Sequence, residues 1–304
     1  MSFISTKSEA IGESNSVQNV HGETVSTSPQ LPENPIVSIN PSKSGLSLNL
    51  SELWQYRDLL YILTMRDIRV RYKQTALGAA WAIVQPLFTM LVFSLFFGRI
   101  IGVPSDEIPY PLFVYAGLTP WLFFSNALTK SGNSLVGNAN LITKVYFPRM
   151  VIPISAVAVG ILDFLIASAF LLALMFYYDF GFSLNFLMLP ILVLIVSLLA
   201  IGLGLLLSGL NVKYRDVGHA LPFLIQLGMF VTPIIYPLSI VPEKWRWIVA
   251  LNPMTGIVEG FRSAFFAKPF DWFSLGLAAI ITIVILIYAA YAFRRMEDDF
   301  ADVI

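Results

Sequence analysis

The residues able to do chemistry are few in this sequence, and most chemistries are excluded. There is no cysteine, and the two histidines, His21 and His219, are widely separated in the chain. We therefore expect no thiol chemistry, no disulfide and no histidine-rich metal site. No nucleotide-binding loop of the form G-x-x-x-x-G-K-[ST] occurs. The sequence predicts a chain that binds no cofactor and is not itself an enzyme.

Asp163 is the charged residue best placed for a function. It lies 12 residues after Val151, where an apolar run begins, and at about 1.5 Å per helical residue this depth is near the centre of a bilayer. A carboxylate there must face the helix bundle and be paired or protonated. Two interpretations stay open: Asp163 lines a transport route, or it locks two helices together.

A group of cations precedes the first apolar run. Arg66, Arg69 and Lys73 recur at helical spacing, with Arg71 among them, so a helix there carries positive charge on one face. Residues 51–75 are too charged for hydrocarbon, and they predict an amphipathic helix lying in the membrane interface. Because cations collect at the cytoplasmic ends of spans, we expect this interface helix on the cytoplasmic side.

Composition places the chain in a membrane. The sequence of 304 residues is 57% hydrophobic and 12% charged, which leaves too few polar side chains to cover a soluble protein of this size. Its formal net charge is zero, so charge gives no reason to expect nucleic acid as a partner. Residues 1–50 differ: they are polar and poor in aromatic side chains, and we expect a disordered cytoplasmic tail.

Apolar runs of about 20 residues, the length that a bilayer requires, predict six transmembrane helices in an all-α integral membrane protein. The transmembrane domain occupies residues 76–304, with spans at about 76–97, 110–128, 151–178 and 184–210, from about 220 onward, and at 273–293. Gly202 and Gly204 predict close helix packing. Pro222, Pro233 and Pro237 predict that the outer half of the fifth span kinks or unwinds.

Residues 241–272 are too apolar for a free loop and too interrupted to span. They predict two short re-entrant helices on the outer side, before the last span. Six spans put both termini on one side, where from Arg57 onward we count twelve Lys and Arg residues. Five lie on the other side: Arg99, Lys244, Arg246, Arg262 and Lys268. This bias predicts cytoplasmic termini.

Between the second and third apolar runs, residues 131–148 are polar and lead into a short turn that ends at a proline. The segment is either a connector with an interfacial anchor or a docking helix for a partner protein. Apolar side chains expected to be exposed beside cations favour docking. These residues are Leu141, Ile142, Val145 and Phe147, beside Lys144 and Arg149.

Four stretches together resemble the permease subunits of type-2 ABC exporters, in the branch that exports O-antigen, capsule and teichoic-acid polymers. They are RDIRVRYKQTALGAAWAIVQP (66–86), NANLITKVYFPR (138–149), NVKYRDV (211–217) and LNPMTGIVEGFR (251–262). The resemblance covers about residues 54–266. It implies a homodimer in the bacterial inner membrane, bound to two copies of a separate ATPase that holds ATP and Mg. It also implies an undecaprenyl-linked polysaccharide as the cargo, with membrane lipid around the protein.

The resemblance further implies roles for individual residues. The coupling helix that contacts the ATPase corresponds to Asn140, Leu141, Ile142, Lys144, Val145, Phe147, Pro148 and Arg149. The interface helix includes Arg66, Arg69, Arg71 and Lys73, and a second cytoplasmic loop includes Lys213, Tyr214 and Arg215. Candidates for lining the route are Trp81, Phe88, Tyr115, Trp121 and Asp163, although aromatic side chains on spans more often pack in the core.

Three other functions remain open. An ABC exporter of drugs or small lipids has the same architecture and differs in its cargo. A proton-coupled flippase working alone would use Asp163 as its relay and would need no ATPase. A membrane-embedded glycosyltransferase is disfavoured, because no acidic cluster lies at a membrane face.

Overall fold

The computed structural model describes residues 54–73, 80–297 and 300. All of them belong to one compact unit, residues 46–304. The predicted disordered tail and both ends of the predicted interface helix, 51–53 and 74–75, lie outside the described residues.

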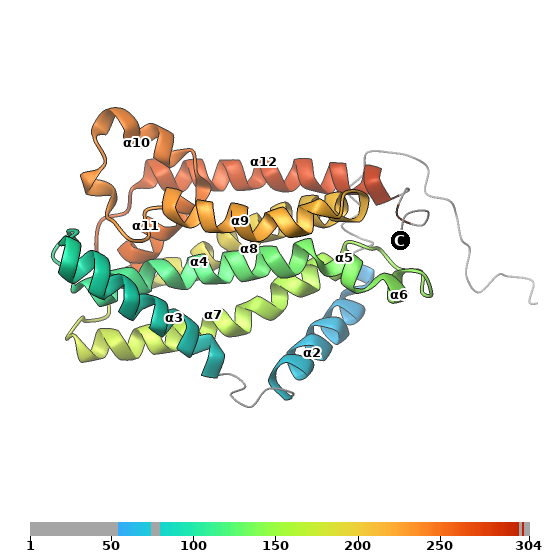
Figure 1. The fold of residues 1–304 in the computed structure, drawn as a ribbon, viewed down its shortest axis with the longest axis horizontal. Helices are drawn as coiled ribbons and strands as arrows, with labels where there is room; N and C mark the ends of the chain where they lie inside the picture. The colour runs from blue at the N-terminus through green and yellow to red at the C-terminus, as the bar shows by residue number, and fades with distance from the viewer. Residues whose placement is uncertain (1–53, 74–79, 298–299, 301–304) are drawn as a thin grey trace, which may run out of the picture. The chain divides into compact units, whose positions relative to one another are not determined.

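The described part of the chain is helical and contains no strand, which confirms the prediction of an all-α protein. Figure 1 shows the helices in chain order. They are α2 (Arg57–Lys73), α3 (Trp81–Phe93), the π-helix η2 (Ser94–Ile101), α4 (Tyr110–Gly132), α5 (Ser134–Gly137), α6 (Ala139–Ile142), α7 (Val151–Tyr177), the 3-10 helix η3 (Leu184–Met188), α8 (Leu189–Lys213), α9 (Asp216–Val231), the 3-10 helix η4 (Leu238–Ile240), α10 (Glu243–Ala250), α11 (Pro253–Phe265) and α12 (Trp272–Glu297).

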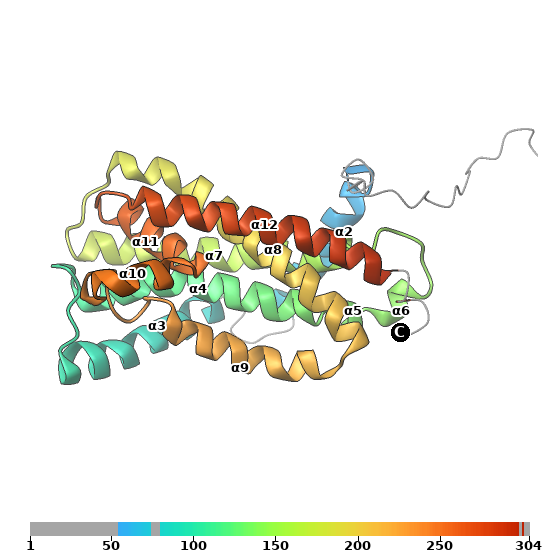
Figure 2. The same ribbon diagram turned by 90° about the horizontal axis from the view of Figure 1, so that it is seen from above.

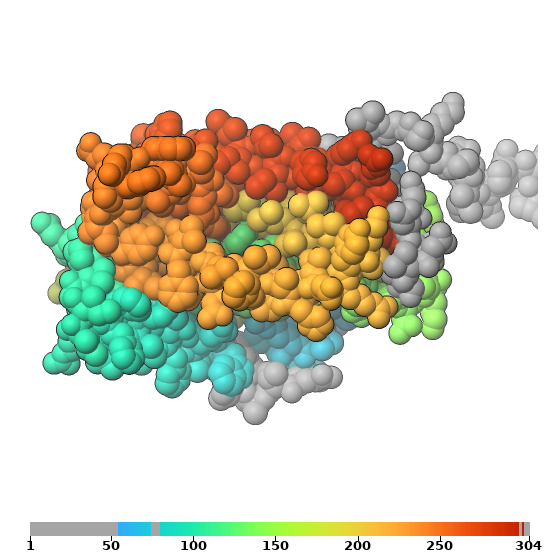
Figure 3. Space-filling model, turned by 45° about the horizontal axis from the view of Figure 1, so that its top comes forward, coloured from blue at the N-terminus to red at the C-terminus, as the bar shows by residue number. Residues whose placement is uncertain are grey.

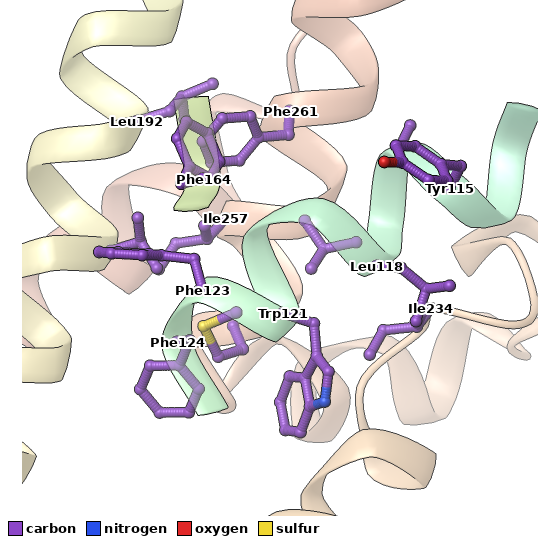
Figure 4. Close-up of a cluster of buried hydrophobic side chains, with 14 of the residues drawn as sticks. Tyr115, Leu118, Trp121, Phe123, Phe124, Phe164, Leu192, Ile234, Ile257 and Phe261 are labelled. Carbon is purple, nitrogen blue, oxygen red and sulfur yellow. The ribbon is translucent and has the colours of Figure 1, made fainter. Parts of the chain in front are cut away.

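The long helices α4, α7, α8, α9 and α12 run alongside one another (Figures 1 and 2). The helix α4 is central, because it contacts α3, α7, α8, α9 and α11. Its side chains form the middle of the main hydrophobic core. Figure 4 shows Leu118 and Phe123 of α4 near Phe164 of α7, Leu192 of α8 and Phe261 of α11.

Four helical stretches in the described residues are long and apolar enough to cross a membrane: Trp81–Ile101, Val151–Tyr177, Leu184–Lys213 and Trp272–Glu297. The predicted second and fifth spans are not among them. The fifth corresponds to α9, which is apolar but has only 16 residues. The second corresponds to α4, which has 23 residues but carries buried polar groups such as Thr119 and Ser125.

The prolines of the predicted fifth span act as the sequence suggests. Pro222 lies inside α9, but the helix ends at Val231, and Thr232 is extended. The chain therefore leaves the helical conformation after Val231, as the prolines predict. Beyond this segment, residues 241–272 form two short helices, α10 and α11. Asn252 caps α11 by accepting a hydrogen bond from the backbone of Met254.

Glycine permits the close approach of α8 and α12, as predicted. A Cβ added at Gly202 would lie 3.1 Å from the Cα of Leu286, and one at Gly204 would lie 2.2 Å from the Ser131 hydroxyl of α4. Because the first contact is with backbone, the neighbouring helix itself would have to move.

Gly202→Val is therefore expected to destabilise the protein by about 1–3 kcal/mol, the usual cost of overpacking. Gly276→Val is the matched control, because Gly276 lies in α12 with nothing within 4 Å of its added Cβ. The measurement is the thermal stability of both variants in detergent. Equal stability would contradict the tight α8–α12 contact.

Candidate functional site

The candidate site residues gather at one end of the helix bundle. The helix α2, the segment from α5 to the start of α7, the α8–α9 turn and the end of α12 lie together there (Figures 1 and 2). A second hydrophobic cluster, the Phe147 cluster, packs these elements against one another. Its buried members are Leu63, Leu135, Ile142, Phe147, Val151, Ile152, Leu205, Val212, Ala289, Phe293 and Phe300.

The predicted interface helix is α2, and its four cations point in two directions. Arg66, Arg69 and Lys73 are exposed. Arg66 also donates from Nη2 to Oδ1 of Asn138 at 3.1 Å, which ties α2 to the segment between α5 and α6. Arg71 is partly buried and faces α7. The helix thus has an exposed cationic face and a face held by the bundle.

Asp163 is the residue of α7 that holds α2 in place. Nη1 of Arg71 donates a hydrogen bond to one oxygen of its carboxylate, and the two side chains form an ion pair. The Tyr72 hydroxyl donates to the other oxygen at 2.5 Å. Burial and this hydrogen bond raise the pKa of Tyr72 to about 12, so the phenol stays protonated and donates at neutral pH. Asp163 is therefore paired, which is one of the states that the sequence allows, and the pair joins α7 to α2.

Asp163 also borders a cavity of about 50 Å³ between α2, α3, α4 and α7. Gln85 and Asn126 share its wall with Arg71 and Trp81. This volume holds roughly one or two water molecules. It is too small for a sugar, so the cavity does not form a route for a polymer in this conformation.

Asp163→Asn is expected to lower stability by about 1.5–3 kcal/mol, the range for hydrogen bonds to charged groups. The substitution leaves the Arg71 guanidinium beside a neutral amide. Thermal unfolding in detergent measures the loss, and a double-mutant cycle with Arg71→Gln isolates the pair. If Asp163→Asn is as stable as the unmodified protein, the ion pair does not hold α2 against α7.

The predicted coupling segment is only partly exposed. Asn140, Lys144 and Val145 face solvent, as does Tyr146, whose surface is 85% exposed. The prediction that Ile142 and Phe147 are exposed is wrong, because both belong to the Phe147 cluster. Leu141 is partly buried against the same cluster. The exposed tip at 143–146 is thus carried by two buried apolar anchors.

The end of the coupling segment is fastened to α12. The backbone N–H of Arg149 donates to Oε1 of Glu297 at 3.1 Å, and its Nη1 donates to the Glu297 carbonyl at 2.5 Å. Its guanidinium also lies over the ring of Phe300, 5.7 Å from the centroid. Pro148, beside it, is partly buried. Arg149 is therefore a fixed anchor, and the exposed tip precedes it.

The residues of the predicted second loop, Lys213, Tyr214 and Arg215, are exposed between α8 and α9. Sequence reasoning missed Asn211, just before them, which is 3% exposed. Its Nδ2 donates to the Gly132 carbonyl at 3.0 Å, and its Oδ1 accepts from the Gly218 N–H at 3.0 Å. The sequence signal for this role is that Asn211 is a polar residue directly after a long apolar run.

The aromatic candidates for lining a route divide into two groups. Trp81 and Phe88 on α3 are 52% and 63% exposed. Tyr115 and Trp121 on α4 are 0% and 4% exposed and lie in the main core (Figure 4). Tyr115 and Trp121 do not border a space that a polymer could enter in this conformation.

Arg262 is a further residue whose burial the sequence did not predict. It was counted among the outer cations, yet it is 2% exposed inside the protein. Its Nη1 donates to Glu259 at 2.8 Å and to the Pro233 carbonyl at 2.7 Å, and its Nη2 donates to the Ile234 carbonyl at 2.6 Å. Arg262 thereby joins α11 to the unwound segment after α9.

Comparison with known proteins gives the family. The sequence pattern of the ABC-2 type transporter family matches residues 58–266. The O-antigen export system permease protein RfbA of Klebsiella pneumoniae is 31% identical over 249 residues, which is 81% of this chain and 95% of that protein. The protein of the same name from Myxococcus xanthus is 31% identical over 83% of this chain and 97% of its own length.

The polysialic acid transport protein KpsM of Escherichia coli is 28% identical over 245 residues, covering 78% of this chain and 92% of that protein. The family pattern extends from α2 through α11 and so includes the interface helix, the coupling segment and the Arg262 contact. This chain therefore belongs to the ABC-2 type transporter family of membrane proteins.

Proposed function

We propose that this chain is the transmembrane subunit of an ABC transporter that exports a lipid-linked polysaccharide, resembling O-antigen, across the bacterial inner membrane. The observation that carries this proposal is the match to O-antigen export permeases over 95–97% of their length. The polysialic acid transport protein KpsM, another carrier named for a polymer, also matches over 92% of its length.

In this proposal the chain crosses the membrane six times, with α4 and α9 added to the four long apolar stretches. Both run alongside those stretches (Figures 1 and 2). Other helices surround α4, so its polar residues avoid lipid and the helix need not be strongly apolar. The helix α9 spans about 24 Å at 1.5 Å per residue, and the non-helical residues between Val231 and Leu238 complete its path.

Six spans place α2, the coupling segment and the end of α12 on the cytoplasmic side. The bias of Lys and Arg supports this orientation. Because Arg262 is buried, it no longer counts as an outer cation, and the bias becomes stronger. In the same arrangement α10 and α11 lie at the outer side as the re-entrant pair.

A separate ATPase, in two copies, supplies the energy in this account and holds the ATP and Mg. We place its contact at the exposed tip, residues 143–146, and at the nearby exposed Asn140, with the second loop beside them. Ile142 and Phe147 are seated in the Phe147 cluster with Leu63 of α2 and Phe293 of α12. A push on the tip is therefore passed to α2, α8 and α12 through close-packed side chains.

We place the second copy of the chain against the face formed by α3 and α9, which Figure 3 shows at the surface. This face carries large exposed apolar side chains: Trp81, Phe88, Leu91, Phe223, Leu224, Leu227 and Phe230. Trp81 and Phe88 then lie where two copies meet. They remain candidates for stacking on sugar rings when the copies separate.

The proton-coupled alternative is weakened by the Asp163 contacts. A relay carboxylate must bind and release protons, whereas Asp163 is held by the Arg71 cation and the Tyr72 hydroxyl. We therefore prefer ATP hydrolysis by a partner protein to proton flow through Asp163 as the source of energy.

Depletion of this protein in its own cells tests the proposal. We expect surface polysaccharide to disappear while lipid-linked polysaccharide accumulates inside the cell, because synthesis continues without export. Unchanged surface polysaccharide would contradict the proposed cargo. An exporter of drugs or small lipids would then be the better account.

A further inference from the structure

A cavity of about 410 Å³ lies between α2, the end of α4, α5 and α7. It is separate from the coupling tip and from the α3–α9 face. Its polar lining consists of Asp67 and Arg71 of α2, Lys130 of α4, and Asn133, Ser134 and Asn138 around α5. Its volume corresponds to roughly a dozen water molecules at about 30 Å³ each.

Lys130 is the unusual group in this cavity. It is partly buried at the end of α4. Within residues 54–73, 80–297 and 300, its ammonium makes no hydrogen bond or ion pair. A cation taken out of bulk water and placed beside a membrane span is normally paired, because desolvating it alone is costly.

The nearby carboxylates are already engaged by other cations. Asp67 accepts from Nε of Arg66 at 2.8 Å, and Asp163 is held by Arg71 and Tyr72. Three cations, Arg66, Arg71 and Lys130, thus face two carboxylates. The excess of one positive charge falls on Lys130, inside a space large enough for a ligand.

The rim of the cavity is built to stay in place. Asn138 accepts from Arg66 at 3.1 Å and donates to the Ser134 carbonyl at 2.9 Å. Asn133 donates to the Thr129 carbonyl at 2.9 Å. These bonds orient the amides of the wall before any ligand enters, which lowers the cost of binding.

We propose that this cavity is a phosphate-binding site in which Lys130 is the principal contact and Arg71 is its cationic neighbour. Lysine binds phosphate as a point charge, and the volume admits a phosphate or a diphosphate. Two sources share this chemistry: the diphosphate of a lipid-linked polysaccharide and the headgroup of an anionic phospholipid. The first source rests on the proposed function, and the second does not.

Chemical labelling of the unmodified full-length protein tests the site without relying on any variant. The protein is placed in nanodiscs of phosphatidylcholine, treated with an amine acylating reagent, and analysed by peptide mass spectrometry. Inorganic pyrophosphate is expected to slow acylation of Lys130 at least threefold. Lys244, exposed on α10, is the internal control and is expected to react at an unchanged rate.

The source is identified by repeating the labelling in nanodiscs that contain phosphatidylglycerol. Protection by phosphatidylglycerol alone identifies a lipid headgroup as the ligand, and protection by pyrophosphate in both lipids identifies a diphosphate. Absence of protection under all these conditions would overturn the proposal. Neither ATP nor polymer is present, so failure here is distinct from failure of the proposed export function.

Variants give an independent measure of the same site. Lys130→Gln is expected to weaken pyrophosphate binding at least tenfold in calorimetry. Lys130→Arg, which keeps the charge, is expected to remain within about threefold, and Lys244→Gln to bind as the unmodified protein does. Equal affinity in Lys130→Gln and the unmodified protein would show that Lys130 is not the contact.

Discussion

Arg262→Ala is expected to destabilise the protein by about 3–5 kcal/mol, the usual cost of removing one partner from a buried ion pair. The substitution leaves the carbonyls of Pro233 and Ile234 without their donor and Glu259 without its cation. It also empties the space over the Phe113 ring, whose centroid lies 3.6 Å from the guanidinium carbon. The helix α11 should then detach from the segment after α9.

The matched control is Arg246→Ala. Arg246 lies on α10 and bonds two backbone carbonyls, but it is exposed, so water replaces its contacts. Thermal unfolding of the purified protein in detergent should show a large loss for Arg262→Ala and a small one for Arg246→Ala. Similar melting temperatures for the two variants would show that Arg262 does not hold α11 against the segment after α9.

Tyr146→Ala is expected to weaken binding of the partner ATPase by about 30-fold, or 2 kcal/mol, the threshold for an interface hot spot. Tyr146 is 85% exposed, and it belongs to neither hydrophobic cluster, so its loss would not disturb them. The amount of the variant in the membrane should therefore be unchanged. Export and co-purification of the ATPase measure the effect.

Phe147→Ala is the informative contrast, because the neighbouring ring is buried in the Phe147 cluster. Its loss should cost about 3–5 kcal/mol of stability, as for other buried phenylalanines. The two substitutions thus separate docking from folding at adjacent positions. If Tyr146→Ala binds the ATPase normally while Phe147→Ala is stable and uncoupled, the assignment of the exposed tip is wrong.

Much of the fold follows from local pattern. Length and apolar composition predict the long helices, and the prolines after α9 predict its end, because proline cannot continue a helix ladder. Gly202 predicts close helix packing for a similar local reason, but it does not identify α12 as the neighbouring helix. These features depend on what each residue does to its own backbone or nearest turn.

Partners across the chain do not follow from local pattern. The sequence allows Asp163 to be paired or protonated, but its partner Arg71 lies 92 positions away, and no spacing rule connects them. The same limit explains Phe147: an apolar residue beside cations looks exposed until Phe293 of α12 is placed against it. The burial of Arg262 likewise depends on tertiary structure, because the sequence of α11 does not show that Arg262 donates to the carbonyls of Pro233 and Ile234.

The contacts show which helices are joined to the small exposed tip. Arg149 is fixed to Glu297 of α12, and Asp163 fixes α2 to α7. The tip between Ile142 and Phe147 has little freedom to move alone, because both ends are anchored. In the transport cycle proposed above, displacement of the tip by an ATPase tilts these helices together and so opens a route between two copies.

The most direct test of the central claim is polymer transport by the purified chain and its partner ATPase in sealed vesicles. Lipid-linked polysaccharide is presented on the ATPase side, and its protection from added glycosidase is measured. We expect protection that requires ATP and persists when a protonophore removes any proton gradient. Protection without ATP, or none with both subunits active in ATP hydrolysis, would contradict the account.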